Sequence, residues 1–131
     1  MLHPNQFQVN EAWIAFQVND APIRTQIDGD FNCVALMDAA SCFILTTAFV
    51  PIDEQEASTA EALRLLKKGR AHKQRLPGTL FIPSGQAANN LAREAQRQRI
   101  TVVRVAEDLL ALFIGEAKTS FAERFGRGDE Q

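Results

Sequence analysis

The stretch from Phe31 to Pro51, FNCVALMDAASCFILTTAFVP, places the strongest constraint on how this chain can fold. Its two halves are rich in β-branched, aromatic and aliphatic residues, which favour strands, and Ala39-Ala40 between them predicts a tight turn. Side chains alternate between the two faces of a strand, and here both faces are apolar. We therefore expect a central hairpin that is covered on both faces, or whose second face meets a partner. Leu36 and Phe43 would both lie in the core.

The composition is that of an ordinary globular chain. The 131 residues are 46% hydrophobic and 23% charged, with a formal net charge of −2. This length predicts a single domain over residues 1–131, with loose polar termini at about 1–10 and 127–131. The small net charge gives no overall attraction to nucleic acid. We expect no membrane association, because no apolar run approaches the ~20 residues of a span and the N-terminus lacks a signal-peptide pattern.

The chain has two cysteines, Cys33 and Cys42. In the register set by the proposed turn, Cys33 pairs with Thr46, and the two cysteines lie roughly 13 Å apart on one face. That separation is too large for a disulfide bond. We therefore expect two reduced, buried thiols and a cytoplasmic protein.

The spacing of apolar residues changes after the hairpin from two to about 3.6, which indicates helices. Ser58 and Glu61 form a capping-box pattern that predicts a helix to about Lys68, with Gly69 as its stop. The other expected elements are strands at 12–18, 23–27, 79–82 and 100–105, and helices at 84–98 and 107–125. Strand–helix–strand units pair their strands in parallel, so this order predicts an α/β (α+β) fold whose mixed sheet has an antiparallel meander followed by β-α-β-α.

Two stretches resemble the integrase and transposase branch of the ribonuclease H-like fold. CVALMDAASCFILTTAFV is similar to the family's strand that ends in Asp and turns into a second apolar strand. LPGTLFIPSG is similar to its Pro-preceded strand, which in the family ends in a metal-binding Asp, but Pro83 stands at that position here. The resemblance covers roughly residues 31–125. It implies a ribonuclease H-like scaffold without the catalytic carboxylate set, or a small uncharacterised domain family of similar pattern.

Candidate binding residues lie at two strand-to-helix junctions. Ser84 and Gly85 follow one strand, where free backbone N–H groups can bind an anion. Glu107 and Asp108 follow the next strand, and ligands of open α/β sheets gather at such strand ends. The alternative is that all four residues have structural roles. Ser84 would cap a helix, Gly85 would fit the bend, and Glu107 and Asp108 would interact favourably with the dipole of the next helix. No motif indicates a cofactor or a metal ligand, so we assign neither.

Three functions remain open. The first is a non-catalytic interaction or self-assembly module with a homodimer or another protein partner, which the two-sided apolar hairpin favours; we lean towards a protein that is not an enzyme. The second is a metal-dependent nuclease or strand-transfer relative, which needs converging carboxylates. The candidates for it are Asp28, Asp30, Glu107, Asp108 and Glu116. The third is nucleic-acid binding through the basic tract at 64–75, which lacks aromatic residues for stacking bases and is typical of a solvated helix end.

Overall fold

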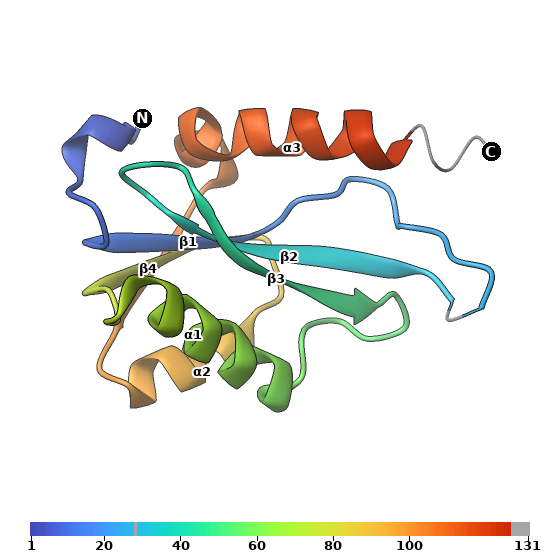
Figure 1. Ribbon diagram of the computed structural model, residues 1–131, viewed down its shortest axis with the longest axis horizontal. Helices are drawn as coiled ribbons and strands as arrows, with labels where there is room; N and C mark the ends of the chain where they lie inside the picture. The colour runs from blue at the N-terminus through green and yellow to red at the C-terminus, as the bar shows by residue number, and fades with distance from the viewer. Residues whose placement is uncertain (28, 127–131) are drawn as a thin grey trace.

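Figure 1 shows the computed structural model, which describes residues 1–27 and 29–126. Its elements are η1 (Pro4–Gln6), β1 (Ala12–Gln17), β2 (Phe31–Asp38), β3 (Ile44–Pro51), α1 (Thr59–Lys73), β4 (Thr79–Pro83), α2 (Asn89–Arg97), β5 (Thr101–Val105), η2 (Glu107–Leu110) and α3 (Ala111–Gly126). The sheet order is β3-β2-β1-β4-β5, with β1, β2 and β3 antiparallel and β1, β4 and β5 parallel. The predicted fold class, an antiparallel meander followed by β-α-β-α, is confirmed.

The sheet lies between two helical layers (Figure 1), with α3 on one face and α1 and α2 on the other. Alternation along β1 sends Ile14 and Phe16 into the core beneath α3, and Trp13 and Ala15 into the core beneath α1 and α2. Because β1 contributes to both cores, five of its six residues are buried. Strand β1 is therefore the centre of the molecule.

The prediction of a central hairpin is wrong for β3, which forms an edge of the sheet. Leu36 in β2 is fully buried as expected, but Phe43 is 50% exposed. Its ring stacks on His72 of α1, with the ring centres 5.1 Å apart. An edge strand has only one neighbour to pair with, and only Ala48 and Val50 of β3 are buried even though its sequence is apolar.

The predicted register of the hairpin is also wrong. Cys33 pairs with Phe49 and not with Thr46, a shift of three residues. The tight turn at Ala39-Ala40 is replaced by a longer loop, which the Asp38 carboxylate holds by accepting from Ser41 N at 3.0 Å and Ser41 Oγ at 2.7 Å. Side-chain hydrogen bonds of this kind compete with a simple backbone turn.

Both thiols are free, so the prediction of reduced cysteines is confirmed. Burial holds for Cys33, whereas Cys42 is only partly buried, with a positive φ of 58° in the loop. Desolvation raises the pKa of the Cys33 thiol to about 11. Burial, followed by the charges of Asp38 and Glu116, raises the pKa of Cys42 above its usual value.

Helix α1 begins as predicted and ends later. The Ser58 side chain accepts from Glu61 N at 3.2 Å, which confirms the N-cap. Gly69, the expected stop, lies inside the helix, where an added Cβ would come within 2.9 Å of side-chain atoms of Trp13 and Leu36. The missing side chain thus lets α1 approach the sheet closely, and the helix ends at Lys73, with Gln74 as its C-cap at a φ of 69°.

Three further expectations differ from the structure. Segment 23–27 forms only an isolated bridge between Ile23 and Phe31, without a strand. The helix expected from residue 84 begins at Asn89, after a turn. The segment before β1 is not loose, because the Phe7 ring packs edge-on against Phe81 and Phe113. The predicted tail at 127–131 lies outside the described residues. The single domain over 1–131 stays a prediction.

Candidate functional site

A polar cleft lies where the three parallel strands end. The carboxyl ends of β1, β4 and β5 meet at one edge of the sheet, and β1 is also the strand where pairing changes from antiparallel to parallel. Open α/β sheets place ligands at such an edge. The cleft has a volume of about 300 Å³. It is lined by Gln17, Asn19, Asp20, Pro83, Gly85, Gln86, Glu107 and Lys118.

The loop after β4 is held firmly over the end of β1. The Arg104 guanidinium donates to the carbonyls of Pro83 at 3.1 Å and Gln86 at 2.6 Å. The Gln86 side-chain oxygen in turn accepts from Gln17 N at 2.7 Å. Two backbone N–H groups of this loop are already paired, because Ser84 N donates to the Val105 carbonyl and Gln86 N to Pro83. The anion-binding backbone that the sequence suggested is therefore largely engaged within the fold.

One ammonium and two carboxylates meet in the cleft. Lys118 projects from α3, and its Nζ lies 2.5 Å from Glu107 Oε1 and 3.5 Å from Asp20 Oδ1. Burial lowers the pKa of Lys118, but the hydrogen bond and charge of Glu107, together with Asp20, outweigh it and raise the pKa above its ordinary value. The ammonium thus stays charged between two carboxylates, in the position where a bound cation would otherwise balance them.

The structure brings together half of the predicted site residues. Gly85 and Glu107 line the cleft, whereas Ser84 and Asp108 do not, although all four are exposed. Ser84 is not the predicted helix cap, because α2 begins after Ala88. Five residues of the cleft were not predicted from the sequence: Gln17, Asn19, Asp20, Gln86 and Lys118. Gln17, Asn19 and Asp20 lie at or just after the carboxyl end of β1, so they could have been predicted if that strand had been considered together with β4 and β5. No local sequence pattern marks Lys118.

The carboxylates considered for metal chemistry are dispersed. Glu107 lies in the polar cleft, and Glu116 lines a different hollow, described below. Asp28 lies outside the described residues. Within residues 1–27 and 29–126, no group of three or more His, Cys, Asp or Glu side chains is arranged to hold a metal ion. Asp38 is fully buried and also accepts from Asn10 N at 2.7 Å, so it serves the hairpin loop.

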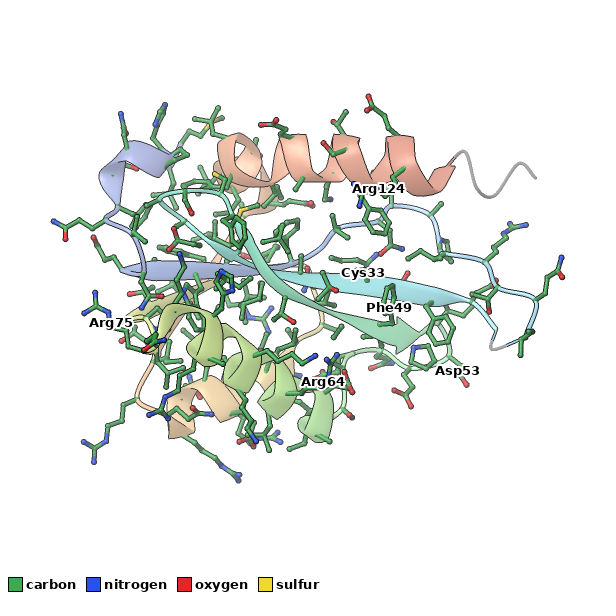
Figure 2. The ribbon with its side chains drawn as sticks, viewed as in Figure 1. Cys33, Phe49, Asp53, Arg64, Arg75 and Arg124 are labelled. Atoms are coloured by element: carbon green, nitrogen blue, oxygen red, sulfur yellow. The ribbon has the colours of Figure 1, made fainter. Side chains whose placement is uncertain are left out.

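A larger apolar groove runs between α3 and the β2–β3 hairpin. Its volume is about 670 Å³, and Figure 2 shows Arg124 on the α3 side and Phe49 on the hairpin side. The floor comes from β2, through Cys33, Ala35 and Met37. Phe49 is 52% exposed and Leu112 of α3 is 50% exposed at its margins. The other lining residues are Val18, Ser41, Cys42, Ile44, Thr47, Phe113, Glu116, Ala117, Ser120 and Phe121.

The basic tract at 64–75 is spread over α1 and the loop after it. Arg64 pairs with Glu61 at 2.8 Å and donates to the Thr47 carbonyl at 3.3 Å, so it ties α1 to β3. Lys67, Lys68 and Arg70 are exposed. In the part of the chain that the structure describes, no helix is long and apolar enough to cross a membrane.

No protein-family model and no curated protein sequence matches this chain. Among solved structures, it is similar to a chain of the simian T-cell lymphotropic virus intasome in complex with PP2A regulatory subunit B56 gamma, with 15% identity and a TM-score of 0.57. That match covers 100% of this chain and 45% of the other, so the chain spans less than half of its neighbour. The HTLV-2 integrase catalytic core domain in complex with magnesium, in dimeric form, matches with 11% identity and a TM-score of 0.47, covering 82% of this chain and 65% of the other.

The match to the intasome chain, together with the order of the strands, defines a class of fold. The chain has the ribonuclease H-like fold. At such low identity the similarity establishes the fold and no specific family.

Proposed function

We propose that this chain is a non-catalytic ribonuclease H-like domain that acts by binding protein surfaces. The observation that carries the proposal is the Lys118 ammonium, which lies between Asp20 and Glu107 at the strand ends. Two-metal chemistry needs several carboxylates that converge on ions about 4 Å apart. Here β1 and β4 end in Gln17 and Pro83, neither of which supplies a negative oxygen, and the Lys118 ammonium lies between the two carboxylates of the cleft.

The apolar groove supports the second half of the proposal. Contiguous apolar hollows with exposed aromatic and aliphatic margins are typical of interaction sites. Phe49 and Leu112 are half exposed at the two margins, and the floor on β2 is apolar. The structural neighbour with the higher TM-score is part of an intasome in complex with a protein subunit, so a domain of this fold can act within an assembly. A homodimer or another protein partner, and no role in nucleic-acid binding, belong to this proposal.

The proposal also includes a cytoplasmic location. Two free thiols, one of them fully buried, support it, because oxidising compartments favour disulfide bonds.

The proposal is tested by titrating Mg²⁺ and Mn²⁺ into the protein in a calorimeter and by incubating it with labelled DNA and RNA and each metal. We expect no saturable heat and no cleavage. Saturable binding together with cleavage that is lost in Glu107→Gln, but kept in Glu123→Gln, would make the protein a metal-dependent nuclease. Glu123 is an exposed residue of α3 that does not line the cleft, so it is a matched control.

A further inference from the structure

One row of residues on α3 faces the apolar groove. Leu112, Glu116, Ser120 and Arg124 are four residues apart, all are exposed, and all line the groove. Residues at this spacing lie along one side of a helix. We name them the α3 row. Glu116 and Arg124 thus lie four residues before and four residues after the small Ser120. The apolar Leu112 lies four residues before Glu116.

The two charges of the α3 row cannot satisfy each other. Glu116 and Arg124 are eight residues apart, which corresponds to about 12 Å along a helix. Within residues 1–27 and 29–126, neither takes part in an ion pair. Each of these two charged side chains therefore lies beside the apolar groove without an oppositely charged partner among the described residues.

An arrangement of this kind is complementary to itself. If a second α3 lies antiparallel to the first, with the two-fold axis at Ser120, then Glu116 faces Arg124 of the partner subunit, and Arg124 faces the partner's Glu116. A two-fold contact uses the same surface on both copies, so one row supplies both ion pairs. The small Ser120 side chain allows the two helices to approach at the axis.

The groove provides the space for that second helix. It is bounded by α3 on one side and by Phe49 and Thr47 of β3 on the other, above the apolar floor on β2. Figure 2 shows the Arg124 and Phe49 side chains on these two sides. A helix that lies beside α3 would cover the apolar floor and the exposed Phe49 ring.

We infer that the partner of this groove is a second copy of the chain, which inserts its own α3 antiparallel to the first and forms a symmetric homodimer. The inference rests on the proposed interaction role and names its surface. The dimer would consist of two sheets with a pair of α3 helices between them. Charge complementarity within the α3 row selects this occupant over an apolar peptide, which would leave Glu116 and Arg124 unpaired.

Charge reversal tests the pairing, with dissociation constants measured by sedimentation equilibrium. Glu116→Arg and Arg124→Glu each place like charges opposite each other twice, so each should weaken the dimer by about 10- to 100-fold. The double variant Glu116→Arg/Arg124→Glu restores both pairs and should return close to the native value. Ala122→Arg adds a charge to the same helix on a side that does not line the groove, since residues two apart do not share a helix face, and should have little effect.

A cross-link tests the position of the axis. Ser120→Cys in a Cys42→Ser background should form an intermolecular disulfide under mild oxidation. The two copies of a residue at a two-fold axis come close together, within the ~4.4–6.8 Å between Cα atoms that a disulfide requires. Ala122→Cys in the same background should cross-link poorly, because residue 122 lies on another side of α3 and does not line the groove. The Cys42 substitution removes the partly accessible native thiol.

The outcomes separate this inference from the proposed function. A native protein that stays monomeric at high concentration, or a dimer that neither charge reversal weakens, overturns the α3 dimer. The metal titration and cleavage assay alone decide whether the domain is non-catalytic. A monomer without cleavage therefore removes the dimer and leaves the interaction role to a different partner.

Discussion

At the scale of single residues, Asp38 shows how one side chain can determine a loop. Its carboxylate is fully buried and accepts from Asn10 N, Ser41 N and Ser41 Oγ at 2.7, 3.0 and 2.7 Å. Two of these bonds shape the hairpin loop, and the third attaches the segment before β1. Buried carboxylates persist only when such donors surround them. The Asp38 carboxylate therefore holds the hairpin loop and the segment before β1 together.

Replacing Asp38 with Ala should lower the free energy of unfolding by about 2–4 kcal/mol, because buried donors lose their acceptor. Ser41→Ala removes only one of the three bonds and should lower it by about 1 kcal/mol. Urea denaturation followed by circular dichroism measures both. A loss below about 1 kcal/mol for Asp38→Ala would mean that water replaces the carboxylate easily and that the loop does not depend on it.

At the scale of elements, the sequence predicts which segments fold into helices and strands better than it predicts how they pair. The apolar runs at 31–51, 79–82 and 100–105 all contain strands, because β-branched and aromatic residues favour the strand conformation wherever they cluster in the sequence. The hairpin register was missed because it depends on hydrogen bonds from Ser41 to a carboxylate. The central place of β1 was missed because a strand buried on both faces shows no alternation.

Gly69 illustrates the same limit within a helix. Glycine near the end of an apolar pattern usually marks a stop, but here it allows close packing against Trp13 and Leu36, which are distant in sequence. Only the tertiary structure separates these two roles.

Two glycines in helices should therefore respond oppositely to the same substitution. Gly69→Ala should destabilise the protein by about 1–3 kcal/mol, because the new Cβ would lie 2.9 Å from the Trp13 ring and force the core to shift. Gly115→Ala in α3 meets nothing within 4 Å and should stabilise it by up to about 1 kcal/mol, the usual gain in helix propensity. Thermal and urea unfolding of the two variants provide the comparison. If both substitutions stabilise the protein, α1 must be able to move away from the sheet without lowering the free energy of unfolding.

At the scale of the whole molecule, the polar cleft and the apolar groove lie on opposite sides of the same helix, α3. Lys118 of α3 closes the cleft, and the α3 row faces the groove. The sequence indicated the cleft in part, since Gly85 and Glu107 follow strands. The groove could not be derived from it, because the groove depends on where α3 crosses the hairpin.

The two cores should unfold together, since β1 and β2 contribute to both. Trp13, the only tryptophan, lies in the core beneath α1 and α2, and Cys33 lies in the core beneath α3. In a Cys42→Ser background, Trp13 fluorescence and Cys33 labelling thus report the two sides separately. Cys33 should label very slowly in the native state at pH 8, because it is buried and its pKa is raised to about 11.

We expect the fluorescence and labelling transitions to coincide across a urea titration, as in a single cooperative domain over residues 1–131. The raised pKa adds a dependence on pH. A thiol whose pKa is higher in the folded state stabilises the fold below its unfolded pKa, near 9.0, and loses that contribution as the pH rises towards 11. The stability of the Cys42→Ser protein relative to Cys33→Ala/Cys42→Ser should therefore fall between pH 9 and 11. Separate transitions for the two probes would instead show that the α3 layer unfolds on its own.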